Sequence, residues 1–287
     1  MTSGAPARTR AARSLRPFWL IPAFYIICFV VLGLLETGAG FLAGPAVANP
    51  RGATFQWLAL ASVVVATWVM LLIEKQPWSF VSLGREAAAP PILANGALLG
   101  AATIGTACLV LLATHMLRID PTTPGSWWGA AGRSAVMLLP AAFFEELFVR
   151  GFAFAVLRRA GGWRLALIVT SVVFGLLHAW NPGADAESIL AVTVAGFFLG
   201  AILLATGSLY AAGAAHFAWN WVMAGALHIS VSGIPSVDPD YRTVETGPDW
   251  LTGGPWGPEG GLAAVAAMFV AIFYLYGRYL RRMELKG

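Results

Sequence analysis

Residues 130–157 read AAGRSAVMLLPAAFFEELFVRGFAFAVL. Most of these residues are apolar, and the stretch is longer than the roughly 20 residues that an α-helix needs to cross a bilayer. Its charged side chains lie inside the apolar run, where ionisable groups are costly and usually functional. The stretch therefore predicts a membrane-spanning helix that carries polar chemistry at membrane depth.

The whole chain has the composition of a membrane protein. Of its 287 residues, 58% are hydrophobic and only 11% are charged, whereas a typical soluble domain is about 25% charged. Because so small a number of charged residues cannot cover a surface that faces water, we expect the folded chain to lie mainly in the lipid bilayer. The formal net charge is +4, but the basic residues cluster beside apolar spans and form no stripe with aromatics, which argues against a nucleic-acid partner.

Eight apolar segments are long enough to cross a bilayer. The expected fold is therefore an all-α, polytopic transmembrane helix bundle with about eight spans. The predicted spans are 17–40, 55–74, 92–116, 130–157, 163–181, 188–206, 208–230 and 260–280. They form one transmembrane domain, 17–281, between a basic tail at 1–16 and a short tail at 282–287.

The distribution of charge between the loops predicts the orientation, because Lys and Arg favour the cytoplasmic side. Basic residues occur in the N-terminal tail and after the second, fourth and eighth spans: Lys75, Arg85, Arg158, Arg159, Arg164, Arg278, Arg281, Arg282 and Lys286. The opposite loops are acidic: Asp120, Asp185, Asp238, Asp240, Glu245 and Asp249. We expect a multi-pass protein of the cell membrane with both termini in the cytoplasm.

Three clusters of polar residues lie inside the predicted spans. They read FFEELFVR at 143–150, FGLLH at 174–178 and HFAWN at 216–220. In the first cluster, Glu146 and Arg150 are four apart, share a helix face and can form an ion pair. Glu145 is rotated by about 100° from Glu146, so it can face a cavity while its neighbour is held structurally.

The other two clusters add imidazoles and an amide. His216 and Asn220 are also four apart and can converge on one position. Phe174 lies one turn before His178, where it can wall a pocket or hold the ring. Each histidine taken alone fits an interhelical hydrogen bond as well as a site, but three clusters at similar depth favour a site.

Two chemistries fit these residues, and the sequence does not choose between them. Glu145, His178 and His216 can hold a divalent metal, commonly zinc, that activates water. Alternatively, Glu145 and His178 activate water directly as general bases. His216 and Asn220 then stabilise the oxyanion that develops on a scissile carbonyl.

The ordered triplet resembles the signature of the CPBP family, which comprises CAAX proteases and bacteriocin-processing enzymes and is also called the Abi family. Its pattern is E-E-x-x-x-R, then F-x-x-x-H, then H-x-x-x-N, and residues 143–220 match it throughout. The resemblance implies an all-α bundle whose cavity opens towards the cytoplasm, and an endopeptidase acting on membrane-associated or lipidated peptides. It implies a catalytic site of Glu145, His178, His216 and Asn220, supported by Glu146 and Arg150.

Other functions remain open from the sequence. No H-E-x-x-H motif, no pair of intramembrane Asp residues and no G-x-S-x-G motif occurs in a span, so other intramembrane protease classes fit poorly. A non-catalytic membrane scaffold or immunity protein of the same family is the main alternative. A proton-coupled transporter is a further alternative, although the two halves show no matching broken helices. The long segment 232–261, which contains Trp250 and Trp256, is either a lid, a re-entrant element or an ordered outer loop.

Overall fold

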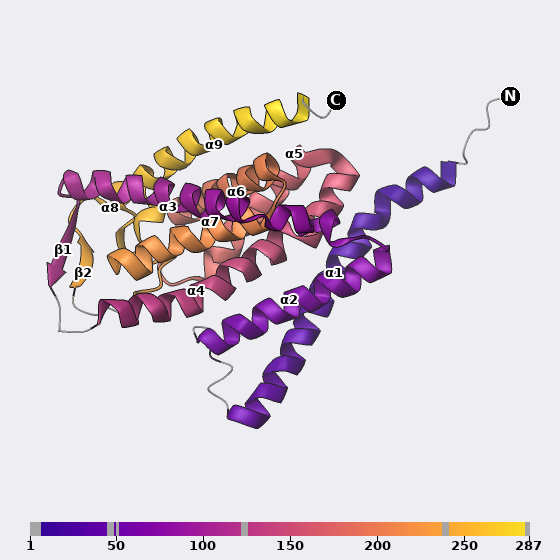
Figure 1. Ribbon diagram of the computed structural model, residues 1–287, viewed down its shortest axis with the longest axis horizontal. Coiled ribbons are helices and arrows are strands. Elements are labelled where there is room, and N and C mark those ends of the chain that lie inside the picture. Colours follow the sequence, from indigo (N-terminus) through magenta and orange to yellow (C-terminus); the bar gives the residue numbers. More distant parts are fainter. Residues whose placement is uncertain (1–6, 45–48, 50–51, 122–125, 237–240, 285–287) are drawn as a thin grey trace.

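The computed structural model describes residues 7–44, 49, 52–121, 126–236 and 241–284. Long helices make up most of it and run roughly along its longest axis (Figure 1). They are α1 (Ala7–Ala43), α2 (Ala53–Glu74), α3 (Pro90–Ala113), α4 (Trp127–Arg150), α5 (Phe152–Leu177), α6 (Ala186–Thr206), α7 (Leu209–Trp221) and α9 (Leu262–Glu284). Short helical turns join them: η2 (Trp78–Val81), η3 (Arg85–Ala88), η4 (His178–Trp180), η5 (Val222–Leu227), α8 (Asp249–Thr252), η6 (Gly254–Trp256) and η7 (Pro258–Gly260).

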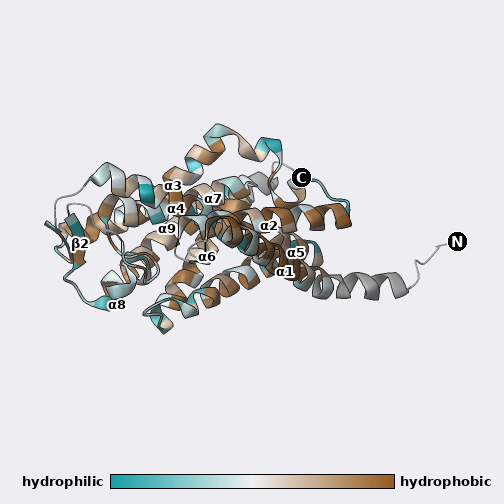
Figure 2. Ribbon diagram, turned by 90° about the horizontal axis from the view of Figure 1, so that it is seen from below, coloured by the Kyte–Doolittle hydropathy of each residue, from teal (hydrophilic) through white to brown (hydrophobic). Residues whose placement is uncertain are grey.

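The helices have the length and composition of membrane spans. Six helical stretches in the described residues qualify, and one of them, Trp127–Trp180, comprises both α4 and α5. The helix α7 is short, but the π-helical turn η5 continues it to Leu227. Hydrophobic residues cover the bundle, and hydrophilic ones gather near β2 and α8 at one end (Figure 2). The chain is an all-α, polytopic, multi-pass integral membrane protein, as the sequence predicts.

The predicted loop between the fourth and fifth spans, 158–162, contains a break in the helix, but the predicted end of the fourth span at residue 157 is wrong. The helix α4 already ends at Arg150, whereas α5 is divided at Gly162, whose φ of 84° and ψ of 174° are not helical. A Cβ on Gly151 would lie 2.3 Å from the Leu147 carbonyl oxygen, so glycine permits the tight break there. Arg159 lies within α5 just before this break and pairs with Glu74 of α2 at 2.8 Å.

A two-stranded sheet closes one end of the bundle, and the sequence did not predict it. β1 (Leu117–Pro121) pairs with β2 (Tyr241–Glu245) in antiparallel register. The rest of the described part of 232–261 includes α8, η6 and η7. In it Trp250 is 55% exposed, as an interfacial residue would be, whereas Trp256 is 2% exposed and packs in the core. Of the loop charges used for orientation, Asp238, Asp240 and Lys286 lie outside the described residues.

Small residues bring α3 and α7 into close contact. A Cβ on Gly96 would lie 2.3 Å from the Ala211 carbonyl oxygen, and one on Gly100 would lie 2.0 Å from that of Ala215. This spacing of small residues lets two helix backbones approach closely in a membrane. The contact fixes the part of α7 that leads into His216.

We predict that both chain ends lie in the cytoplasm. The helix α1 begins, and α9 ends, away from the end of the bundle that carries the sheet (Figure 1). The loop after α2 lies beside the α6–α7 turn, since the Ser208 hydroxyl donates to the Ala87 carbonyl oxygen at 2.6 Å. Reporter fusions after Gly287 should therefore show a cytoplasmic C-terminus, and a reporter active on the outer face would mean that the number of spans is odd.

Candidate active site

The helix α4 carries a buried ion pair at the centre of the polar cluster. Nη1 of Arg150 donates to Oε1 of Glu146 at 2.6 Å, and both side chains are at most 1% exposed. Nη2 of Arg150 donates to the Gly196 carbonyl oxygen of α6 at 3.0 Å, and its guanidinium lies 4.5 Å from the centre of the Phe174 ring. The pair predicted from the i, i+4 spacing is present and connects α4, α5 and α6.

The protein fixes the proton positions of both imidazoles. Nδ1 of His178 lies 2.8 Å from the Phe174 carbonyl oxygen, which can only accept, so this nitrogen donates. Nδ1 of His216 lies 3.1 Å from Oε1 of Glu146 and donates to that carboxylate in the same way. The Nε2 atom of each neutral imidazole is therefore left with a free lone pair.

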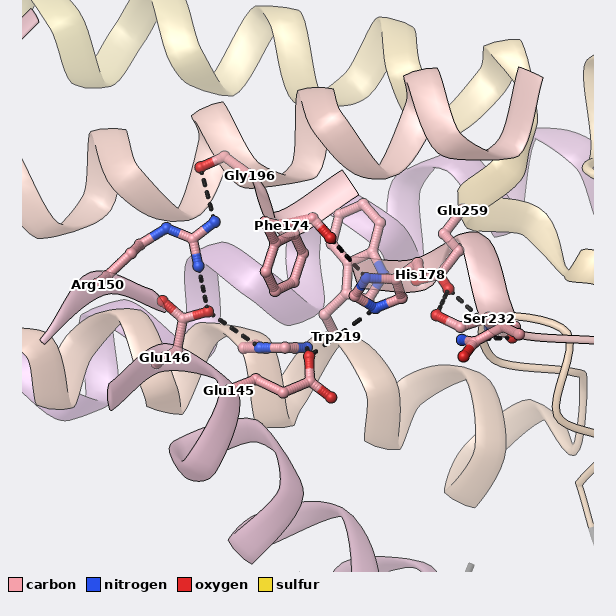
Figure 3. A network of polar contacts seen from close by, with 11 residues as sticks. Glu145, Glu146, Arg150, Phe174, His178, Gly196, Trp219, Ser232 and Glu259 are labelled. Atoms are coloured by element: carbon pink, nitrogen blue, oxygen red, sulfur yellow. Dashed lines mark hydrogen bonds and ion pairs between the residues drawn. The ribbon is translucent and has the colours of Figure 1, made fainter. Parts of the chain in front are cut away.

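Glu145 meets the two histidines on their Nε2 sides. Its Oε2 atom lies 3.9 Å from Nε2 of His178 and 3.8 Å from Nε2 of His216. This oxygen is buried and has no hydrogen-bond partner among the described residues. Its side chain as a whole is 34% exposed, whereas that of Glu146 is 1% exposed. The two adjacent glutamates are thus placed differently, and only Glu145 is accessible (Figure 3).

A small cavity lies beside the imidazoles. Its volume is about 20 Å³, enough for about one water molecule. Its polar lining includes His178, His216 and Asn220, and Phe174 forms part of its apolar wall. Glu145 is not among the lining residues, but its Oε2 atom lies 3.9 and 3.8 Å from Nε2 of His178 and of His216. Three of the four residues of the expected catalytic site therefore line this cavity.

The residues do not fit a metal ion as they are placed. Two imidazole nitrogens and one carboxylate form a donor set of the kind found in catalytic zinc sites. However, no group of three or more His, Cys, Asp or Glu residues in the described part of the chain could hold a metal. Ligands of a tetrahedral zinc ion lie about 3.4 Å from one another, given bonds of about 2.1 Å, and Glu145 is 3.8 and 3.9 Å from the two histidines. We therefore derive no step through a metal.

Three residues of the site were not predicted from the sequence: Trp219, Ser232 and Glu259. Ser232 and Glu259 line the small cavity with His178 and Asn220. Glu259 accepts hydrogen bonds from Trp219 of α7 and from Ser232. Glu259 lies 40 residues beyond Trp219 in the sequence, in a Gly- and Pro-rich segment without a catalytic motif, so no spacing pattern links it to the site.

A second, much larger cavity lies near the end of the bundle opposite the sheet. Its volume is about 1070 Å³, and its lining comes from α2, η2, η3, α3, α4, the α6–α7 turn and α7. Most of the lining is apolar and includes Leu60, Trp78 and Phe143, with Arg85 and Glu86 among the few charged residues. The two cavities share the helix α7, which lines the larger one through Leu209 and Tyr210 and the smaller one through His216 and Asn220.

Fold and site together define a multi-pass membrane protein with a polar Glu, His and Asn site enclosed by its helices. Residues 127–222 match the family model described as Type II CAAX prenyl endopeptidase Rce1-like. The matched segment contains all seven site residues expected from the sequence, and it confirms the resemblance to the CPBP family of CAAX proteases. No curated protein and no solved structure matches the chain.

Proposed function

We propose that this protein is an intramembrane endopeptidase of the CAAX type, which hydrolyses peptide bonds of membrane-associated or lipidated peptides. The observation that carries the proposal is the convergence of Oε2 of Glu145 on Nε2 of His178 and of His216, at 3.9 and 3.8 Å. Oε2 of Glu145 and Nε2 of a neutral His178 are acceptor atoms that attract a molecule with hydrogens to donate, and water is such a molecule. A carboxylate and an imidazole that hold water are suited to general-base catalysis.

The proposed reaction uses these groups in sequence. Glu145 takes one proton from the water while Nε2 of His178 accepts a hydrogen bond from the other hydrogen, and the water oxygen bonds to the scissile carbonyl carbon. The carbonyl oxygen becomes an oxyanion, which accepts hydrogen bonds from Asn220 and from Nε2 of His216, which is an imidazolium throughout the reaction. The C–N bond then breaks, and the proton held by Glu145 passes to the leaving amine.

Glu146 and Arg150 act on this reaction indirectly. Glu146 accepts the Nδ1 hydrogen of His216 at 3.1 Å, so its negative charge stabilises the imidazolium form that the oxyanion step requires. Arg150 holds Glu146 in place and balances its charge in a buried setting. We assign both residues a supporting role.

The larger cavity supports a substrate with an apolar portion. At about 1070 Å³ it is at the upper end of the size of small-molecule pockets, and its lining is mostly apolar. A lipid chain attached to a peptide would find in it a mostly apolar surface, with Arg85 among the few charged groups. A lipidated peptide is therefore the substrate class that we favour over an unmodified soluble peptide.

The test is cleavage of a peptide library, presented with and without an attached lipid chain, by the purified protein and by its Glu145→Ala variant. We expect cleavage by the wild-type protein only, with the lipidated members preferred. Because the proposed mechanism uses no metal, cleavage should persist after treatment with EDTA. Loss of cleavage in EDTA, restored by added zinc, would contradict the metal-free mechanism. No cleavage by the wild-type protein would favour a non-catalytic scaffold or immunity protein.

A further inference from the structure

Glu259 is a buried carboxylate whose two oxygens are both engaged as acceptors. Oε1 accepts from the backbone N–H of Ser232 at 2.7 Å and from its hydroxyl at 2.6 Å. Oε2 accepts from Nε1 of Trp219 at 2.9 Å. Glu259 is 6% exposed, and no cation lies in ion-pair contact with it within the described residues. Both oxygens of Glu259 thus accept a hydrogen bond from an N–H group.

The two residues that donate to Glu259, Trp219 and Ser232, both line the small cavity. Trp219 directly precedes Asn220 on α7 and is 4% exposed. Ser232 lies at the tip of a tight turn in which Val231 and Ile234 exchange backbone hydrogen bonds. The Ser232 carbonyl oxygen accepts from Nδ2 of Asn181, in the connection that follows His178, at 3.1 Å. The Glu259 carboxylate thus links the helix of Asn220 to the segment behind His178.

Two backbone segments beside this carboxylate, the turn at Ser232 and the segment around Gly257, approach each other closely. Ser232 has φ of 48° and Gly233 has φ of 75°, the left-handed pair that a two-residue turn of this kind requires. Such a conformation is uncommon for serine and needs support from its surroundings. Gly257, with φ of 105°, would bring a Cβ to 2.1 Å from the Ser230 carbonyl oxygen, so only glycine lets the segment of Glu259 approach the turn so closely.

We propose that Glu259 is a positioning residue for the hydrolytic site, an inference that rests on the proposed endopeptidase function. His178 lies between Glu145 on one side and Glu259 with Ser232 on the other (Figure 3). By fixing Trp219, Glu259 sets the orientation of the neighbouring Asn220. By fixing Ser232, it holds the cavity wall at a distance that leaves about 20 Å³, the space for one water molecule.

Glu259→Gln is the first variant that tests this role. The side chain keeps its size, but one acceptor oxygen becomes an NH₂ group that faces either the Trp219 N–H or the Ser232 N–H. A displaced oxyanion donor and cavity wall should lower kcat by about 10- to 10²-fold, as expected for small misplacements near the chemistry. KM should change by less than about threefold, because the lost interactions serve the transition state. Glu187→Gln, the same change at an exposed residue of α6, should leave kcat and KM unchanged.

A double-mutant cycle with Trp219→Phe tests whether the effect passes through the indole. If Glu259 acts by holding Trp219, the double variant should lose about as much activity as the more damaged single variant. In parallel, the NMR signal of the Trp219 indole N–H should change its chemical shift in Glu259→Gln. The signal is assigned by its absence from the spectrum of Trp219→Phe. Losses that multiply, or an unchanged kcat in Glu259→Gln, would overturn the inference. So would a fall in kcat that is matched by an equal fall in the folded fraction.

The design separates this inference from the proposed function. If the wild-type protein cleaves the peptide and Glu145→Ala does not, the proposed function is supported. A Glu259→Gln variant as active as the wild type would then contradict only the positioning role of Glu259. If the wild-type protein and Glu145→Ala behave alike, both proposals fail together, whatever the indole signal shows.

Discussion

Replacing Glu145 by alanine should lower peptide cleavage by several orders of magnitude while the folded bundle stays intact. The side chain is 34% exposed and makes no short hydrogen bond through Oε2, so its removal leaves little buried polar surface unpaired. The proposed reaction, in contrast, loses its general base. His178→Ala and His216→Ala should each abolish cleavage as well, because each contributes an Nε2 atom to the same position. Rates of cleavage and thermal unfolding of the purified variants measure both effects.

Asn220→Ala should lower cleavage less than Glu145→Ala does. As one oxyanion donor it should cost about 10²- to 10³-fold in kcat, less than the loss of the base. Glu145→Gln, which keeps the shape of the side chain but not its charge, should be as inactive as Glu145→Ala. Glu187→Ala, at an exposed position, should behave as the wild type. The proposal fails if a Glu145→Ala, His178→Ala double variant keeps its biological function, because the protein would then act as a scaffold.

The sequence predicted the features that depend on local spacing. A separation of four residues on one helix was enough to expect the Glu146–Arg150 pair, which the structure contains at 2.6 Å. Consecutive side chains on a helix point in directions that differ by about 100°, which was enough to predict different surroundings for Glu145 and Glu146. Composition alone indicated the membrane bundle, since a chain with 11% charged residues has few other ways to fold.

Features that depend on distant residues were not predicted. The sheet joins Leu117 to Glu245 across more than a hundred residues, and no local pattern encodes that register. Glu259 enters the site through side-chain contacts with Trp219 and Ser232, so only the folded chain shows its position. The end of the fourth span was misplaced because residues 152–157, which follow the break at Gly151, are as apolar as the span itself.

Glu146→Ala should damage stability and activity together, unlike Glu145→Ala. Arg150 would stay buried, at 1% exposure, with only the Gly196 carbonyl oxygen and the Phe174 ring as contacts. An uncompensated buried charge typically costs about 3–5 kcal/mol of folding stability. Expression and the thermal unfolding temperature should therefore fall. Cleavage should also fall, because His216 loses the carboxylate that fixes its Nδ1 hydrogen.

A second substitution separates these two consequences. In Glu146→Leu, Arg150→Met the buried pair is replaced by apolar groups of similar size, an exchange that is often neutral or stabilising. The double variant should therefore regain much of the thermal stability but none of the activity, because His216 still lacks its carboxylate partner. Glu74→Ala is the matched control: its partner Arg159 is 38% exposed and stays hydrated, so the loss should be about 1 kcal/mol or less. A double variant that is both stable and active would show that Glu146 only neutralises Arg150 and has no part in holding His216.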